Sequence, residues 1–118
     1  MFNRKVNSAQ MLGRFQPWHT GHKELFKESL NRIGQVCIMV RDMPISEKNP
    51  FTFEEVKERI ELSLGPEYEG TYEIISVPNI TNIFYGRDVG YKIDYIELPE
   101  DIKRISATKI RKEINKEK

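Results

Sequence analysis

The sequence predicts an α/β fold, a single domain over residues 1–118 with about five parallel strands and helices on both faces of the sheet. Two observations predict it. Short apolar runs of strand length alternate along the chain with longer segments whose apolar residues recur at helical spacing. The resulting order of strand, helix, strand, helix and strand is typical of a parallel sheet joined by right-handed crossovers. A chain of 118 residues is long enough for one compact domain and too short for two ordinary ones.

Each predicted element has its own signal. Apolar positions in the segment Gly21 to Ile33 recur at helical spacing, and Gly34 follows as the residue type that ends helices. Thr52 and Glu55 have the spacing of a capping box, which predicts the start of a second helix. A continuous apolar run over 35–40 is typical of a strand covered on both faces. The other predicted elements are strands at 9–12, 72–77, 80–85 and 93–98, the end of the second helix at Gly65 and Pro66, and a last helix from Ser106 to Ile114.

Composition and charge exclude several classes of protein. Hydrophobic residues at 38% and charged residues at 31% are typical of a soluble domain, and no apolar stretch approaches the ~20 residues of a membrane span. The net charge of +1 gives no overall field for nucleic acid or a membrane surface. One cysteine, Cys37, excludes an intrachain disulfide, and the polar start of the chain lacks the apolar segment of a signal peptide. We therefore expect a cytoplasmic protein.

The loop after the first strand, Gly13 to His22, predicts an anion site. Ligands of parallel sheets bind at the carboxyl ends of the strands, which is where this loop lies. His19 and His22 are three residues apart at the start of a helix, so both rings can face one side and donate hydrogen bonds to phosphate oxygens. The free amides of the helix start attract the same negative charge. The combination suits stabilising the extra charge on a phosphorus atom under attack.

Two other interpretations of these histidines stay open at this point. A single histidine near a helix start is often only a cap or a surface residue, although both histidines of this chain fall in one loop. A zinc site is the second alternative, but no cysteine and no patterned carboxylate accompanies the pair.

A second pattern of the same kind lies near the C-terminus. Ser106 and Thr108 are residue types that begin helices, and their hydroxyls and amides can face a phosphate. Arg111 lies near the same face of the first turn, where its guanidinium can bind two phosphate oxygens. Alone, this run is typical of an N-capped surface helix. Together with the first loop, it favours a phosphate site.

The two patterns resemble the signatures of the nucleotidyltransferase superfamily. Gly13 to His22 is similar to its Gly-x-Phe-x-Pro-x-His-x-Gly-His loop, and Ile105 to Arg111 is similar to its Ile-Ser-x-Thr-x-Ile-Arg run. The resemblance covers residues 9–115, nearly the whole chain. It implies a Rossmann-like domain that binds a nucleoside triphosphate, usually with Mg²⁺. It also implies transfer of the nucleoside monophosphate to a small phosphorylated acceptor, with release of pyrophosphate.

Roles for single residues follow from the resemblance. It implies that His19 and His22 contact the triphosphate and steady the transition state. Lys48, in the loop after the second strand, is a candidate catalytic cation, with a solvated loop lysine as the alternative. Arg87 and Asp88 suggest a pocket for the base or the acceptor, with a turn closed by their ion pair as the alternative. The nucleotide-binding residues that the resemblance implies are Gly13, Arg14, Phe15, Gln16, His19, Gly21, His22, Ser106, Thr108 and Arg111.

Two branches of the superfamily compete for the nucleotide. The segment Arg14 to Pro17 is similar to archaeal-type nicotinamide-mononucleotide adenylyltransferases, and so is the segment Asn49 to Thr52 before the second helix. Both favour transfer of AMP from ATP. The alternative is a CTP-dependent cytidylyltransferase that acts on a polyol phosphate or a phosphonate. A non-catalytic nucleotide-binding regulator is a further hypothesis, and the near-neutral charge argues against nucleic-acid binding. The resemblance also implies a homodimer or a larger homo-oligomer.

Overall fold

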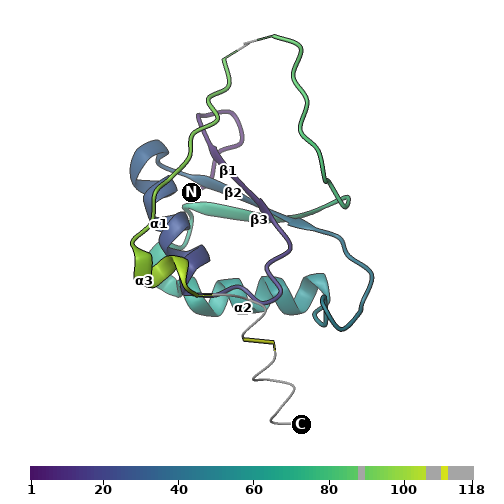
Figure 1. Ribbon diagram of the computed structural model, residues 1–118. Coiled ribbons are helices and arrows are strands. Elements are labelled where there is room, and N and C mark those ends of the chain that lie inside the picture. Colours follow the sequence, from purple (N-terminus) through teal and green to yellow (C-terminus); the bar gives the residue numbers. More distant parts are fainter. Residues whose placement is uncertain (88–89, 106–109, 112–118) are drawn as a thin grey trace.

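The structure is a computed structural model that describes residues 1–87, 90–105 and 110–111. Within these residues a parallel sheet of three strands, in the order β1-β2-β3, packs against two long helices (Figure 1). The α/β class with a parallel sheet is therefore confirmed. The elements are β1 (Ala9–Gly13), α1 (Thr20–Ile33), β2 (Val36–Arg41), α2 (Phe53–Leu64), the short 3₁₀ helix η1 (Pro66–Tyr68), β3 (Tyr72–Val77) and α3 (Glu100–Lys103).

The ends of the two long helices follow the signals in the sequence. Gly34 ends α1 in the left-handed conformation, at φ 104°, and its N–H donates to the Leu30 carbonyl. At the start of α2, the Thr52 hydroxyl accepts from the Glu55 N–H at 3.2 Å, and the Glu55 carboxylate accepts from the Thr52 N–H at 3.0 Å. The predicted glycine stop and the predicted capping box are both confirmed.

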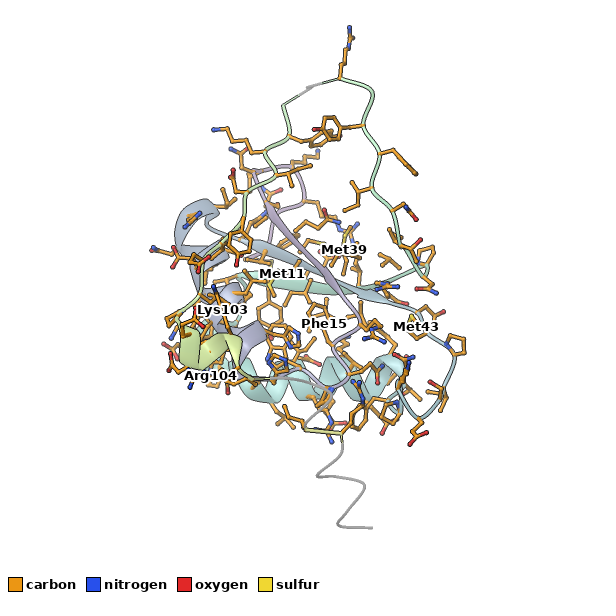
Figure 2. The ribbon with its side chains drawn as sticks, in the orientation of Figure 1. Met11, Phe15, Met39, Met43, Lys103 and Arg104 are labelled. Carbon is orange, nitrogen blue, oxygen red and sulfur yellow. The ribbon has the colours of Figure 1, made fainter. Side chains whose placement is uncertain are left out.

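Both long helices cover the same face of the sheet, as Figure 1 shows. In β2, Val36, Ile38 and Val40 are buried and share one core with side chains of α1 and α2. Cys37 and Met39 alternate with them and are only partly buried, on the side of the sheet away from α2 (Met39 in Figure 2). Right-handed crossovers that step across a sheet in one direction place their helices on one face. The predictions of helices on both faces, and of a second strand covered on both, are wrong for the described residues.

The two further strands that the sequence predicts between residues 78 and 99 are not strands in the structure. The segments 80–85 and 93–98 have no regular secondary structure, and Phe84 and Tyr95 within them are 87% and 77% exposed. A parallel neighbour needs a crossover of about a dozen residues, whereas only residues 78 and 79 separate β3 from the first segment. A short segment rich in apolar residues therefore does not suffice for a strand here. Three strands replace the predicted five in the part of the chain that the structure describes.

The chain after residue 99 returns to the start of α1. The short helix α3, which the sequence did not indicate, packs beside α1. The carbonyl of Ile102 lies 3.7 Å from the place that a Cβ on Gly21 would occupy. The predicted last helix falls mostly outside the described residues. Only Ile110 and Arg111 of its predicted range are described, and both are helical. None of the described helices has the length and apolarity that a membrane span requires.

Two residues of α2 test the position of the core. Ile60 is fully buried, and Leu62 on the same helix is 75% exposed. Ile60→Ala should lower the free energy of unfolding by about 2–5 kcal/mol, because it removes buried apolar atoms and also leaves a cavity in the core. Leu62→Ala is the matched control and should change it by less than about 0.5 kcal/mol. Urea unfolding followed by circular dichroism measures both, and equal losses would contradict the orientation of α2.

Candidate functional site

The loop from β1 into α1 folds tightly onto the core. Phe15 has a left-handed backbone, at φ 52°, and its ring is 5% exposed on the side of the sheet that α2 covers (Figure 2). The peptide bond from Gln16 to Pro17 is cis. A Cβ on Gly13 would stand 3.0 Å from two carbon atoms of the Phe15 ring. Gly13 and Phe15 therefore determine the shape of this loop through their packing.

His19 and His22 form a capping box at the start of α1. The His19 Nδ1 accepts from the Gly21 N–H at 3.0 Å, and the His22 Nδ1 accepts from the His19 N–H at 3.1 Å. The two rings stack with their centroids 3.8 Å apart. A nitrogen that accepts from an amide carries no proton, so each neutral ring holds its proton on Nε2. The pair offers two Nε2–H donors beside the helix start.

Aromatic side chains surround His22. Its ring lies edge-on to Phe15, with centroids 4.9 Å apart, and 5.5 Å from Trp18. Trp18 is buried and donates its indole N–H to Ser63 Oγ at 3.0 Å. Burial, followed by the nearby charge of His19, lowers the pKa of His22 to about 3, and burial lowers the pKa of His19. At neutral pH the two rings are hydrogen-bond donors and not cations.

The two helix starts at this edge of the sheet differ in charge. No acidic residue lies in the first turn of α1, so its amides keep their partial positive charge. In α2, Glu54 and Glu55 lie in the first turn, and the Glu55 side chain occupies the cap. Gly21 allows the His19 ring to lie over the start of α1, because a Cβ there would stand 2.8 Å from the ring. An anion is therefore attracted to α1 and repelled from α2.

Two arginines bring positive charge to this loop. The Arg14 Nη1 donates to Asn49 Oδ1 at 3.4 Å. The Arg111 Nη1 donates to the Gln16 carbonyl at 2.5 Å, across 95 positions of sequence. The predicted C-terminal run and the first loop thus meet through Arg111. The guanidinium groups of both arginines carry a full positive charge at neutral pH.

The other predicted site residues are not brought to this loop by the described structure. Lys48 is exposed in a turn closed by paired backbone hydrogen bonds between Ser46 and Asn49. Arg87 is exposed in the segment 78–99, whose apex lies well away from the loop after β1 in Figure 1. The predictions for Ser106, Thr108 and Asp88 fall outside the described residues.

Sequence reasoning assigned no role to Trp18, Asn49 and Phe51, which support the site. Trp18 forms one wall of the pocket of His22, Asn49 binds Arg14, and the Phe51 backbone binds the Gln16 side chain. A cleft of about 240 Å³ adjoins Gln16 between the end of β2 and the start of α2. The segment Asn49 to Thr52 entered the sequence analysis only as part of the adenylyltransferase resemblance, which does not indicate partners 35 residues away.

The tautomer of the histidines bears on the zinc alternative. Among the described residues, no three side chains of His, Cys, Asp or Glu come together in a way that could hold a metal ion. A zinc ion binds an imidazole nitrogen that carries no proton. Here the unprotonated Nδ1 of each ring is already paired with an amide of the α1 start. The geometry therefore favours the phosphate interpretation over the zinc interpretation.

Comparison with known proteins agrees with this geometry. The model of the family described as cytidylyltransferase-like matches residues 11–79, from β1 to just beyond β3. The chain belongs to this family. The predicted superfamily is thereby confirmed.

Relatives of this cytidylyltransferase-like chain are named for adenylyl transfer. The nicotinamide-nucleotide adenylyltransferase of Thermoplasma acidophilum is 32% identical over 82 residues, which cover 68% of this chain and 46% of the relative. The enzyme of the same name from Saccharolobus solfataricus is 41% identical over 73 residues, which cover 58% of this chain and 42% of the relative. The chain therefore spans less than half the length of these relatives.

A solved structure has a similar fold. It is a bifunctional NMN adenylyltransferase/ADP ribose pyrophosphatase from Francisella tularensis, crystallised with AMP and an Mn ion. Its TM-score to this chain is 0.53 at 31% identity, and the match covers 62% of this chain and 23% of that one.

The His22 ring should stay neutral well below the usual range of histidine. At about pH 5, long-range ¹H–¹⁵N correlation spectra should show a protonated Nε2 and an unprotonated Nδ1 in the His22 ring, as its hydrogen bond from the His19 N–H requires. The pKa of His22 falls from 6.5 to about 3 in the folded chain, so the unfolded chain binds more protons between those values. The contribution of His22 to the free energy of unfolding is therefore complete above pH 6.5 and is lost as the pH falls toward 3.

His22→Phe is the control for this pH dependence. It keeps an aromatic ring beside Phe15 and Trp18, loses the bond to the His19 N–H, and cannot titrate. Its free energy of unfolding should therefore fall less than that of the wild type between neutral and acidic pH. Titration of His22 near its ordinary pKa in the folded protein would contradict the described hydrogen bonds.

Proposed function

We propose that this chain transfers AMP from ATP to a small phosphorylated acceptor and releases pyrophosphate. The observation that carries the proposal is the pair of Nε2–H donors, held by His19 and His22 at a helix start free of acidic residues. Arg111 contacts the same loop and supports a site for several phosphates. The relatives named as nicotinamide-nucleotide adenylyltransferases support ATP as the donor.

The reaction is one in-line displacement. An anionic oxygen of the acceptor phosphate forms a bond to the α-phosphorus while the bond from that phosphorus to the bridging oxygen breaks. The electron pair of the broken bond leaves with pyrophosphate, and no general base is needed. His19 and His22 donate their Nε2–H groups to phosphate oxygens as negative charge grows there, and they transfer no proton. Arg14 and Arg111 attract the β- and γ-phosphates.

A divalent cation enters with the substrate as MgATP. Mg²⁺ keeps several waters and is usually bound by substrate phosphates with one or two carboxylates. The described residues bring no cluster of acidic side chains to the loop after β1, which fits a cation carried by the triphosphate. The Francisella tularensis structure with AMP and an Mn ion supports a divalent cation in related sites.

Nicotinamide mononucleotide is the first acceptor to test, because the relatives are named for it. The second candidate is transfer of CMP from CTP to a polyol phosphate or a phosphonate, which the cytidylyltransferase-like family description favours. The cleft beside Gln16 is the proposed place for the base or the acceptor. A homodimer or larger homo-oligomer is expected from the resemblance and is tested by light scattering. Exposed apolar side chains support it, namely those of Ile83, Phe84, Tyr85, Tyr91, Ile93 and Tyr95.

His22→Ala tests the catalytic assignment. The change removes one Nε2–H donor, so turnover should fall by about 10²–10³-fold. Pyrophosphate release is measured with MgATP and nicotinamide mononucleotide, and in parallel with MgCTP and glycerol phosphate. Thermal unfolding of the variant shows whether the loss reflects chemistry or unfolding.

Cys37→Ala is the matched control, because Cys37 lies on the face of the sheet away from this loop. It should keep the wild-type rate. Near-normal turnover by His22→Ala would contradict the catalytic role. Tight binding of ATP without pyrophosphate from any acceptor would favour a nucleotide-binding regulator.

A further inference from the structure

We propose that Gln16 is a positioning residue of this site. It fixes the place of the Arg111 guanidinium relative to the histidine pair and does not itself bind the nucleotide. The inference rests on the proposed function, because it assigns Arg111 to the phosphates. It replaces the direct nucleotide contact that the family resemblance implies for the Gln16 side chain.

The side-chain amide of Gln16 is paired at both ends with the backbone of one residue. Its Oε1 accepts from the Phe51 N–H and its Nε2 donates to the Phe51 carbonyl, both at 2.9 Å. Gln16 is 4% exposed, so bulk water does not compete for these bonds. The amide therefore acts as a peptide group of a neighbouring strand would. Glutamate lacks the donor that this arrangement needs, and methionine lacks both partners.

Phe51, the partner of the Gln16 side chain, is itself held in place by its packing. Its ring packs against the core, and the guanidinium carbon of Arg59 lies 4.3 Å from the ring centroid. The next residue, Thr52, caps α2. The Gln16 side chain thus ties the loop after β1 to the start of a long helix.

The backbone of Gln16 carries the contact with Arg111. The Arg111 Nη1 donates to the Gln16 carbonyl at 2.5 Å, and His19, which begins the capping box, follows three residues later. Pro17 and Trp18 between them are buried. A shift of Gln16 therefore moves the acceptor of Arg111 while α1 continues to hold the histidines. The bonds between Gln16 and Phe51 therefore help to keep the guanidinium at a fixed distance from the two Nε2–H donors.

A double-mutant cycle tests this coupling. Gln16→Met keeps the length of the side chain and removes both hydrogen bonds, and Arg111→Ala removes the guanidinium. Calorimetry gives the affinity for MgATP of the wild type, both single variants and the double variant, each well below its unfolding temperature. Arg111→Ala should weaken binding about tenfold in the wild type, as expected for a charge-assisted hydrogen bond. In the Gln16→Met background it should weaken binding less than about threefold, because the guanidinium is already displaced.

Ser63→Ala is the matched control background. It removes the hydrogen bond from Trp18, which also ties this loop to α2 but involves neither Gln16 nor Arg111. Arg111→Ala should still weaken binding about tenfold there, although the protein loses stability as it does in Gln16→Met. If Gln16→Met fails to fold, Gln16→Glu serves in its place, since it keeps the acceptor for the Phe51 N–H.

The outcomes separate the inference from the proposed function. Full additivity of the effects of Gln16→Met and Arg111→Ala on the affinity for MgATP overturns the positioning role. The same holds if the wild type binds MgATP and the Arg111→Ala variant binds it with the same affinity. A wild type that binds neither MgATP nor MgCTP overturns the proposed function, and the inference with it. Loss of the Arg111 effect in Gln16→Met but not in Ser63→Ala supports the positioning role.

Discussion

The backbone amides at the start of α1 hold both histidines by their Nδ1 atoms, and the rest of the site depends on that constraint. A ring bound in this way carries its proton on Nε2 and cannot turn without breaking the cap. The three-residue spacing of His19 and His22 is the spacing that a capping box needs. Gly21 lies between them because a side chain there would collide with the His19 ring. One short pattern thus starts the helix and also leaves one Nε2–H donor on each ring.

Burial of this pair determines where the positive charge of the site must come from. Phe15 and Trp18 enclose His22, and the pKa of that ring is lowered to about 3. Neutral rings give directional hydrogen bonds that do not change over the physiological pH range, but they attract a distant polyanion only weakly. With a net charge of +1, the whole chain does not attract one either. The attraction must therefore come from Arg14, Arg111 and the amides of α1.

Local signals predicted the parts of this structure that local contacts determine. The Thr52 and Glu55 capping box, the Gly34 stop and the histidine loop lie where the sequence indicated. The number of strands was not predictable from the apolar residues at 80–85, because a parallel strand also needs a crossover, and two residues do not provide one. The face that α2 covers depends on the direction of its crossover, which no local pattern records. The contacts of Gln16 with Phe51 and Arg111 join residues 35 and 95 positions apart. The family resemblance placed Gln16 and Arg111 in one site, but neither contact was predicted.

The segment Asn49–Phe51 shows how a small sheet can hold such a site. Asn49 is buried and binds Arg14, Pro50 is exposed, and Phe51 binds Gln16. Alternate residues thus face the loop after β1, as they would in a neighbouring strand, although no strand ladder forms there. Side-chain amides replace the missing backbone ladder, and an amide supplies both a donor and an acceptor. The rigidity of the phosphate loop therefore depends on the identity of a few polar side chains, and a change at one of them alters the site without altering the sheet.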